Sequence, residues 1–460
     1  MTPTFQSRRA LVVGLGRSGL SAAKFLAGRG AVVSATDSQT EAALGPVAAT
    51  LSSLGVELHL GGHEPDLFLR QDLVVVSPGV PWDLPPLVEA RRRGVEVIGE
   101  VELAAPFLQG RVIGITGSNG KTTTTALTGH LLRGAGLPVQ VGGNIGAPLP
   151  PVIDMVATST PDIWNVVELS SFQLESIRTF RAAIGVALNV TPDHLDRHFT
   201  FEQYAAAKGR LFATQEAGDY AILNAGDPVC VGYAAQTRAT PVWFSRTVAV
   251  NLGTSVSGGW IVFRRDGAET RLAEVAAVPI RGDHNLENSL AACAAAFLAG
   301  ASPESIGQAL PAFRAVEHRL EFVRRVGGVD YYNDSKATNV DATEKALLAF
   351  DGNLWPILGG KDKGGDFRPL RDLLHEKAKA VLLIGAGAPR IAEHLGDAVT
   401  LVNAGTIERA LDYAAAHAAS GDTVLLAPAC ASFDQFQNYE HRGRVFKQLV
   451  HALREPVPHT

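Results

Sequence analysis

Short apolar runs separated by glycine turns and helical stretches recur along the chain. Near the start, ALVV at residues 10–13 is followed by a glycine turn, a helical stretch at about 20–28 and a second apolar run that ends at Asp37. This order is typical of a βαβ unit, whose strands are buried on both faces and therefore read as continuous apolar segments. The pattern predicts an α/β fold from the first residues onward.

The same pattern restarts twice. A new strand is expected at RVIGIT, and VDYYNDS, LWPILGG, AVLLIGAG and DTVLLAPA predict four short strands after about Val316. A chain of 460 residues is too long for one ordinary core and suggests about three units. The Pro-rich segment 142–162 is expected to be a loop. The expected domains are residues 1–99, 100–315 and 316–460.

Composition excludes several classes of protein. The chain has 41 Lys+Arg against 46 Asp+Glu, a formal net charge of -5, which gives no electrostatic footprint for nucleic acid or anionic lipid. The first apolar run is cut short by glycines, and the Ala-rich stretch 288–301 is too short to cross a bilayer, so neither a signal peptide nor a membrane span is expected. Three cysteines without CxxC spacing argue against disulfides or zinc and fit a reducing cytoplasm: Cys230, Cys293 and Cys430.

The first glycine loop follows a strand and opens a helix. Gly14, Gly16 and Gly19 have the G-x-G-x-x-G spacing, and Asp37 ends the next strand, which matches the dinucleotide-binding fingerprint. Backbone N–H groups at a helix N-terminus bind any pyrophosphate, so a UDP-sugar satisfies the motif as well as NAD does. The glycines can also serve only a tight turn and close helix packing. The loop alone leaves these alternatives open.

A second glycine loop, TGSNGKT at residues 116–122, also lies between a strand and a helix. It departs from the P-loop pattern because Ile115 occupies the first glycine position. The chemistry is unaffected, since the N–H groups can still converge on phosphate oxygens, Lys121 can neutralise the β- and γ-phosphates, and the Thr122 hydroxyl can ligate Mg²⁺. ATP is the expected ligand.

Acidic residues end two further strands of the same expected sheet. Glu168 follows one strand, and Asp193, His194 and Asp196 crowd the end of another. Carboxyl ends of parallel strands share one sheet edge, and carboxylate oxygens suit Mg²⁺. Glu168 is therefore a candidate Mg²⁺ ligand, with an ordinary strand-end acid as the alternative, and His194 is a candidate ligand of a second metal.

These segments, together with GGNIG, ELSSFQLE, YAAAKGR, GDHN, EHRLE, NDSKATN and ACASFDQF, closely resemble the Mur ligase family in order and spacing over essentially the whole chain. Folylpolyglutamate synthases share the ATP site, but NDSKATN and ACASFDQFQNYEHRG look like the branch that adds D-glutamate. The DNPR-type segment associated with the diaminopimelate-adding relative is absent.

The resemblance implies a fold and an activity. It implies three consecutive α/β domains: a Rossmann-like N-terminal domain that binds a UDP-sugar, a P-loop-type central ATPase domain, and a Rossmann-like C-terminal domain that binds the amino acid. The implied enzyme is an ATP-dependent ligase that joins D-glutamate to the L-alanyl carboxylate of UDP-N-acetylmuramoyl-L-alanine in peptidoglycan precursor synthesis, and hence serves cell-wall biogenesis, cell shape and cell division. It is expected to act as a cytoplasmic monomer with two Mg²⁺ ions.

The resemblance also implies residue roles. Lys208 in YAAAKGR is expected to be carbamylated, and Lys361 competes with Lys363 for the carboxylate of D-glutamate. The expected catalytic residues are Lys121, His194, Lys208 and Lys336. The expected metal ligands are Thr122, Glu168, His194 and carbamylated Lys208. ATP is expected at Gly117, Ser118, Asn119, Gly120, Lys121, Thr122, Thr123, Asn285, Asn288, Arg319 and Asp334. The other substrates are expected at Gly16, Arg17, Ser18, Asp37, Ser38, Ser77, Gly79, Asn144, Thr338, Lys363, Ser432 and Tyr439.

Three alternatives remain at this level. An NAD(P)-dependent oxidoreductase explains the first glycine loop but leaves the second loop and the acidic cluster unexplained. A catalytically silent nucleotide-sugar-binding regulator is disfavoured because Lys121, Glu168, His194 and Lys208 are all present. A ligase for another amino acid is the serious alternative, because specificity depends on a few residues rather than on the fold.

Overall fold

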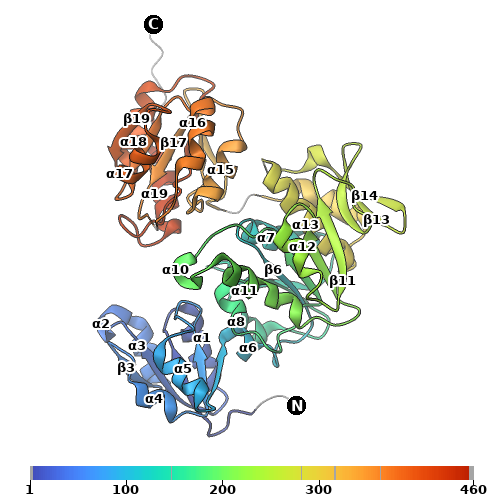
Figure 1. Ribbon diagram of the computed structural model, residues 1–460, viewed down its shortest axis with the longest axis vertical. Helices are drawn as coiled ribbons and strands as arrows, with labels where there is room; N and C mark the ends of the chain where they lie inside the picture. The colour runs from blue at the N-terminus through green and yellow to red at the C-terminus, as the bar shows by residue number, and fades with distance from the viewer. Residues whose placement is uncertain (1–3, 147, 281, 315–316, 363, 455–460) are drawn as a thin grey trace. The chain divides into compact units, whose positions relative to one another are not determined.

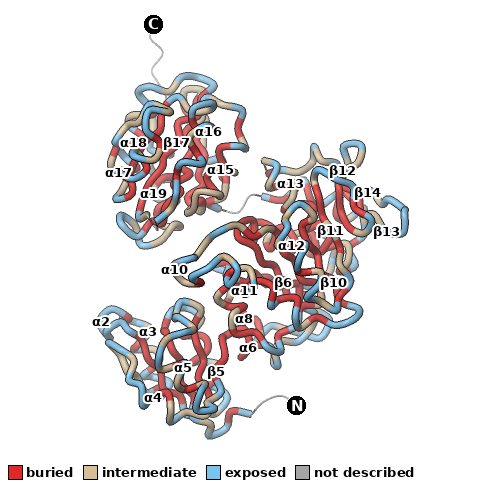
Figure 2. The backbone as a smooth tube through the Cα atoms, viewed as in Figure 1, coloured by how far each residue is buried: buried red, intermediate tan, exposed pale blue. Residues whose placement is uncertain are grey.

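The computed structural model describes residues 4–146, 148–280, 282–314, 317–362 and 364–454. They form two compact units, the first comprising Met1–Val275 and Glu287–Leu310, the second Ala276–Leu286 and Pro311–Thr460. The first unit contains a five-stranded and a nine-stranded sheet, and the second contains a six-stranded sheet. Figure 1 labels their elements, and Figure 2 shows that buried residues concentrate in the sheets.

The first sheet is entirely parallel, with strand order β3-β2-β1-β4-β5. Its central strands are apolar and buried, and β4 is LVVV with all four residues buried. Gly19 lets α1 approach the loop after β1, because a Cβ there would lie 1.9 Å from the Gly14 carbonyl oxygen. The strands are β1 (Arg9–Val13), β2 (Val32–Asp37), β3 (Glu57–Leu60), β4 (Leu73–Val76) and β5 (Glu96–Gly99). The helices are α1 (Arg17–Ala27), α2 (Glu41–Leu44), α3 (Pro46–Ser53), α4 (Pro65–Leu69) and α5 (Pro85–Arg92).

The central sheet has the order β14-β13-β12-β11-β10-β9-β6-β8-β7. It is parallel from β7 to β12, and β13 and β14 add an antiparallel edge. Its strands are β6 (Arg111–Thr116), β7 (Val139–Gly143), β8 (Trp164–Glu168), β9 (Ile184–Ala187), β10 (Tyr220–Asn224), β11 (Thr240–Ser245), β12 (Gly253–Ser257), β13 (Trp260–Arg265) and β14 (Ala268–Glu274). The helices in this stretch are α6 (Glu100–Ala104), α7 (Lys121–Gly134), α8 (Val152–Met155), α9 (Ser171–Leu174), α10 (Leu195–His198), α11 (Phe201–Ala213), α12 (Pro228–Tyr233), α13 (Asp283–Leu298) and α14 (Pro303–Ala309).

The third sheet has the order β15-β16-β20-β17-β18-β19, and only β15 is antiparallel to its neighbour. Its strands are β15 (Glu321–Val326), β16 (Val329–Asn333), β17 (Leu354–Gly359), β18 (Val381–Ile384), β19 (Leu401–Gly405) and β20 (Thr423–Leu426). Its helices are α15 (Val340–Leu348), α16 (Arg371–Lys377), α17 (Ala388–Leu395), α18 (Ile407–His417) and α19 (Tyr439–Ala452). Among the described helices, none is long and apolar enough to cross a membrane.

The α/β class is confirmed, with two differences from the predicted elements. The segment 142–162 is not all loop, because β7 ends within it and α8 and a short 3-10 helix (Val156–Thr158) follow. The last part of the chain has six strands rather than four. Pro151 opens α8, where a missing N–H costs little, and the carboxylate of Glu100 accepts the N–H of Ile153 at 2.6 Å.

Two glutamates of α6 fasten this helix to two segments outside the sheet strands, the loop before β9 and helix α8. The Glu102 carboxylate accepts N–H groups from Arg178, Thr179 and Phe180 at 2.7–3.2 Å. Glu100 holds α8, but its Oε2 forms no hydrogen bond of ordinary geometry with any residue that the structure describes. Burial raises the pKa of Glu100 from 4.5 to about 7, opposed by hydrogen bonding from Ile153 and Gln173.

This raised pKa predicts a pH-dependent contribution to stability. Between about pH 4.5 and 7 the folded protein keeps a proton that the unfolded chain has released, so the contribution of Glu100 falls as the pH rises through this range. Glu100→Gln should therefore gain up to about 3 kcal/mol relative to wild type between pH 5 and pH 8. Urea unfolding of both proteins at the two pH values measures this difference. Exposed Glu64 provides the control Glu64→Gln, and equal pH dependence in wild type and Glu100→Gln would contradict the prediction.

Candidate active site

The second glycine loop lies at the carboxyl end of β6, where α7 begins. Gly117 and Gly120 have φ of 154° and 83°, so both occupy backbone conformations that side chains disfavour. At Gly120 a Cβ would lie 2.2 Å from Oδ1 of Asn288, which shows how closely α13 packs against the loop. The predicted residues Asn285 and Asn288 are both buried in the first turns of α13. The loop thus has the form of a phosphate-binding loop at a helix N-terminus.

Two lysine amines meet at one carbonyl oxygen of this loop. Nζ of Lys208 and Nζ of Lys121 donate to the Gly117 oxygen at 2.7 and 2.8 Å, and Lys121 also donates to the Ser118 oxygen at 2.9 Å. Lys208 lies on α11 and is 1% exposed. Burial, and next the charge of Lys121, lower the pKa of Lys208 well below its ordinary value. Lys208 is therefore a buried amine beside the phosphate loop, in surroundings that disfavour its charged form.

Glu168 ends β8, directly beside β6. Its side chain is buried, and its Oε2 has no hydrogen-bond partner among the described residues. The backbone N–H of Asn144 donates to the Glu168 carbonyl oxygen at 2.9 Å, which places this predicted substrate residue, itself exposed, next to the acid. A buried carboxylate oxygen without a partner fits a Mg²⁺ ligand, because Mg²⁺ prefers hard oxygen donors.

His194 begins α10 with a φ of 54°, an uncommon value for a residue with a side chain. Its ring contacts the Phe172 ring edge-to-face with centroids 4.9 Å apart. The Tyr204 ring lies near it, at 6.5 Å between centroids, and the Tyr204 hydroxyl is 3.0 Å from Oγ of Ser118. The Nζ of Lys208 lies 4.6 Å above the same Tyr204 ring. Tyr204 thus joins the phosphate loop, Lys208 and the His194 loop.

The first glycine loop is held by two residues that were predicted as substrate contacts. The Asp37 carboxylate accepts the N–H of Leu15 at 2.6 Å, and the Ser77 hydroxyl donates to the Gly14 carbonyl oxygen at 2.6 Å. Gly16 and Arg17 are exposed at the N-terminus of α1, and Ser38 is exposed after β2. Gly79 follows in the loop after β4. The predicted contacts Gly16, Arg17, Ser18, Asp37, Ser38, Ser77 and Gly79 therefore follow β1, β2 and β4, whose carboxyl ends lie at the same sheet edge.

In the second unit, three loops follow the carboxyl ends of the parallel strands β16, β17 and β20. Asp334 is buried beside Arg319, with Oδ1 and Nη1 3.9 Å apart. Burial raises the pKa of Asp334 to about 6, opposed first by the charge of Arg319. Lys336 lies with Nζ 5.4 Å from the ring centre of Tyr439. The predicted residues Thr338 and Ser432 lie in the first and last of these loops, whereas Lys363 lies outside the described residues.

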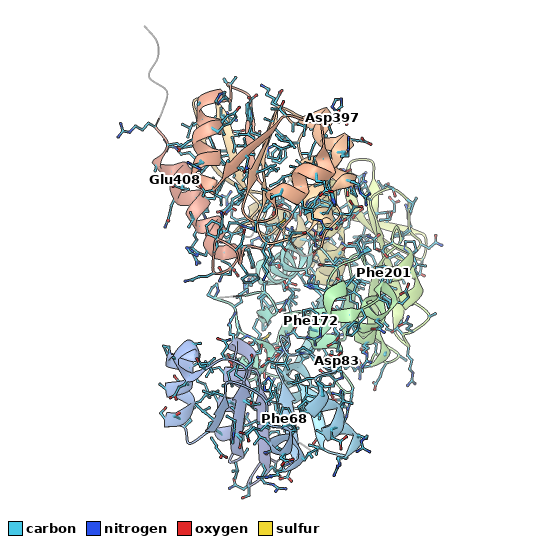
Figure 3. The ribbon with its side chains drawn as sticks, turned by 60° about the vertical axis from the view of Figure 1, so that its left-hand side comes forward. Phe68, Asp83, Phe172, Phe201, Asp397 and Glu408 are labelled. Atoms are coloured by element: carbon cyan, nitrogen blue, oxygen red, sulfur yellow. The ribbon has the colours of Figure 1, made fainter. Side chains whose placement is uncertain are left out.

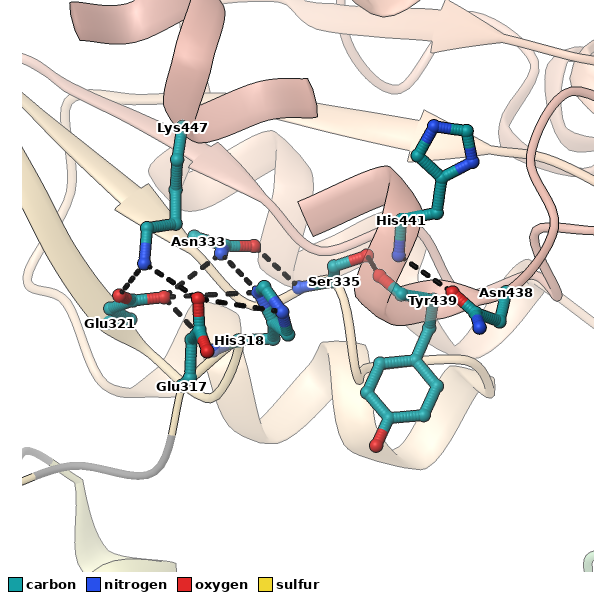
Figure 4. Close-up of polar contacts among 9 residues, drawn as sticks. All are labelled: Glu317, His318, Glu321, Asn333, Ser335, Asn438, Tyr439, His441 and Lys447. Atoms are coloured by element: carbon teal, nitrogen blue, oxygen red, sulfur yellow. Dashed lines mark hydrogen bonds and ion pairs between the residues drawn. The ribbon is translucent and has the colours of Figure 1, made fainter. Parts of the chain in front are cut away.

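A polar network, drawn in Figure 4, links α19 and the segment before β15 to the loop after β16. Lys447 of α19 pairs with Glu321 at 2.5 Å, and Glu321 accepts hydrogen bonds from Asn333 and the His318 N–H at 3.0 and 2.9 Å. The His318 carbonyl oxygen in turn accepts the Lys336 N–H at 3.2 Å. Helix α19 thereby positions the segments that carry Arg319 and Lys336.

Arg442, also on α19, joins two of the loops. It is 1% exposed. It donates to Oγ and the carbonyl oxygen of Ser335 at 3.0 and 2.9 Å, and to the carbonyl oxygens of Cys430 and Ala431 at 3.1 and 3.3 Å. Burial lowers its pKa to about 10. The guanidinium thus clamps the loop after β16 to the loop after β20.

Arg442→Met should destabilise the second unit by about 3–5 kcal/mol, because several buried carbonyl oxygens lose their donor. Arg442→Lys should recover only part of this loss, since one ammonium cannot span both loops. Urea unfolding followed by tryptophan fluorescence measures the effect. Arg444→Met, which removes an exposed arginine of the same helix, is the matched control, and equal stability of the two methionine variants would contradict the prediction.

The structure thus brings predicted residues together within each unit, and their roles in binding and catalysis stay predictions. In the first unit it brings together Lys121, Lys208, Glu168 and His194 around the phosphate loop, as described above. Tyr204 and Arg442 were missed by sequence reasoning. Tyr204 could have been found, because it lies four residues before Lys208 and so shares its face of α11. The local sequence gave no sign that Arg442 is buried.

Comparisons with known proteins identify the family. Residues 8–99 match the Mur ligase MurD-like N-terminal domain, residues 115–296 the Mur ligase middle domain, and residues 318–430 the Mur ligase glutamate ligase domain. The chain belongs to the Mur ligase family. A relative from Solibacter usitatus, named UDP-N-acetylmuramoylalanine–D-glutamate ligase, is 62% identical over 97% of this chain and 98% of its own length. A relative of the same name from Acidobacterium capsulatum is 53% identical over 98% of this chain and 97% of its own length.

Solved structures confirm the fold. A pseudomurein peptide ligase type C from Methanothermus fervidus has a TM-score of 0.61 at 19% identity, covering 97% of this chain and 100% of its own. The UDP-N-acetylmuramate–alanine ligase from Thermotoga maritima has a TM-score of 0.60 at 18% identity, covering 97% and 99%. At such identities these structures establish the three-domain Mur ligase architecture alone.

Proposed function

We propose that this protein is the ATP-dependent ligase that joins D-glutamate to the L-alanyl carboxylate of UDP-N-acetylmuramoyl-L-alanine, forming ADP and phosphate in peptidoglycan precursor synthesis. The observation that carries the chemistry is the pair of lysine amines, Lys121 and Lys208, at the Gly117 carbonyl oxygen. The strand next to β6 adds buried Glu168, whose Oε2 has no hydrogen-bond partner in the part of the chain that the structure describes. The choice of D-glutamate is supported by relatives of that name at 53–62% identity over almost the whole chain.

Division of labour among three domains is part of the proposal. Residues 1–99 bind the UDP-sugar, 100–315 bind ATP, and 316–460 bind D-glutamate, with Lys363 or Lys361 holding its carboxylate. The family matches within each range support this division. The residues proposed to bind the UDP-sugar, ATP and D-glutamate all belong to one chain, so a second copy is not needed to complete the site, and this supports a monomer. Three free, buried cysteines support a reducing compartment, the cytoplasm.

The first chemical step makes the L-alanyl carboxylate electrophilic. One carboxylate oxygen attacks the γ-phosphorus of ATP, the bond to the β,γ-bridging oxygen breaks, and ADP leaves an acyl phosphate. Lys121 stabilises the charge that develops on the transferred phosphoryl group, together with the N–H groups of the glycine loop. The amine of D-glutamate then attacks the acyl carbon, phosphate departs, and the amine loses a proton as the amide forms. His194 and Lys336 would help hold the charge of the leaving phosphate.

Two Mg²⁺ ions are expected. When bound, they would act as Lewis acids and neutralise negative charge on the phosphates. Thr122 and Glu168 would hold one, and His194 and a carbamate on Lys208 the other. The environment of Lys208 supports the modification, because only a neutral amine attacks CO₂ and burial together with the charge of Lys121 lowers the pKa of this amine. The resulting carbamate would replace a buried amine by an anionic oxygen ligand.

The reaction route is tested by isotope transfer. With ¹⁸O in the L-alanyl carboxylate, the acyl-phosphate route requires one ¹⁸O atom to appear in the released phosphate, and mass spectrometry of phosphate and of the nucleotide-sugar product detects both. Product without label in the phosphate would contradict the acyl phosphate. Absence of a D-glutamate adduct would contradict the proposed function itself.

A further inference from the structure

The loop that joins β4 to α5, residues 77–84, belongs to the first sheet and carries Ser77 and Gly79. It is tied to the first glycine loop, since Ser77 donates to the Gly14 carbonyl oxygen at 2.6 Å. Val80 of this loop lines a small cavity together with Phe172 of α9 and Arg197 of α10. Figure 3 labels Asp83 of this loop and Phe172 of the segment after β8, which mark the two sides of the junction.

One side chain spans this junction directly. Arg197 of α10 donates from Nη2 to the Val80 carbonyl oxygen at 2.9 Å and to Oε2 of Glu175 at 3.0 Å. Its guanidinium carbon lies 5.0 Å from the centre of the Phe172 ring. The Arg197 and Glu175 side chains are 13% and 16% exposed, so this ion pair is screened less than a surface pair.

The same contacts reach His194. The Phe172 ring, which contacts the Arg197 guanidinium, packs edge-to-face against the His194 ring, with centroids 4.9 Å apart. It also stacks on the His198 ring at 5.4 Å, and His198 is fixed by Oγ of Ser171 at 2.9 Å and by Glu175 at 3.3 Å.

Helix α10 depends on such contacts for its position. It has only four residues, Leu195–His198, and residues with positive φ, His194 at 54° and Phe199 at 63°, stand at its two ends. A helix of this length has no stability of its own. Its orientation, and with it that of His194, is therefore set by the side chains that anchor it, among them Arg197, which reaches the loop after β4.

We infer that Arg197 is a positioning residue that couples the sugar-nucleotide loop after β4 to His194, so that binding of the UDP-sugar favours binding of the metal–nucleotide complex. This inference rests on the proposed function. Coupling of this kind is reciprocal: each ligand must raise the affinity of the other by the same factor. Arg197 acts through His194 and through the loop backbone, without touching the reacting atoms.

The test measures the coupling factor rather than activity. Isothermal titration gives the Kd of UDP-N-acetylmuramoyl-L-alanine with and without Mg²⁺ and a non-hydrolysable ATP analogue. Wild type should bind the sugar nucleotide at least about fivefold more tightly when the analogue is present, and Arg197→Met should reduce that factor to about one. Each ligand alone should bind Arg197→Met within about threefold of wild type, whereas a merely structural defect would weaken binding of each ligand alone.

Two further variants sharpen the result. Arg197→Lys should give an intermediate coupling factor, because an ammonium can pair with Glu175 but does not present the guanidinium fork. Arg210→Met removes a neighbouring arginine that donates to the Glu175 carbonyl oxygen and should keep the full factor. An unchanged factor in Arg197→Met, or no coupling in wild type, would overturn the inference. A wild-type protein that binds no UDP-sugar would instead overturn the proposed function.

Discussion

Lys208→Ala should lower turnover at least about a thousandfold, because the proposed carbamate would be an anionic metal ligand, and loss of such a ligand costs several kcal/mol of transition-state stabilisation. Small carboxylic acids such as acetate or propionate should restore part of the activity by supplying the missing carboxylate in the space left by the side chain. The unmodified amine cannot take this role, since it is a donor to the Gly117 oxygen and lies beside Lys121.

The measurement is the rate of phosphate release with and without added carboxylate. Lys24→Ala removes an exposed lysine of α1 and is the control, which should show neither loss nor rescue. Removal of CO₂ from the buffer should reduce wild-type turnover, and ¹³CO₂ should give a carbamate carbon signal by NMR in wild type but not in Lys208→Ala. Full activity of the unrescued variant would exclude the carbamate role.

Glu168→Gln should lower turnover by about a hundred- to a thousandfold without destabilising the nucleotide-free protein. The amide keeps the size of the side chain but loses the charge that Mg²⁺ requires. The buried Oε2 has no hydrogen-bond partner among the residues that the structure describes, and a buried charge costs more than a buried neutral group. Removal of this charge should therefore leave the melting temperature equal or higher.

Thermal unfolding and steady-state kinetics separate these two effects. Glu202→Gln, which changes an exposed glutamate of α11, should alter neither the melting temperature nor turnover. Addition of Mg²⁺ and nucleotide should raise the melting temperature of wild type more than that of Glu168→Gln, because ligands stabilise the state that binds them. A variant that loses activity together with stability in the absence of nucleotide would show that Glu168 serves the fold.

The sequence predicts those parts of the site whose residues directly follow a recognisable strand or belong to a glycine loop. GSNGKT after RVIGIT specifies a phosphate loop because both the strand and the helix N-terminus are visible locally, and Glu168 is visible as an acid at a strand end. The lowered pKa of Lys208 was not visible in the same way. It depends on burial and on Lys121, which lies 87 residues earlier in the chain.

Elements whose stability comes from distant partners could not be predicted. Helix α8 lies in a Pro-rich segment, but Glu100 caps it from 53 residues away. Arg442 lies in the polar sequence HRGR, which is typical of an exposed helix, yet its partners Ser335 and Cys430 bury it completely. In both cases the decisive contact joins positions whose proximity only the folded chain establishes.

Phosphate release from ATP in the presence of Mg²⁺ and UDP-N-acetylmuramoyl-L-alanine tests the central claim most directly, with D-glutamate compared with L-glutamate and other amino acids. We expect release that requires the UDP-sugar and D-glutamate together. Release that depends on a different amino acid would contradict the proposed substrate, and no release with any of them would contradict the ligase activity.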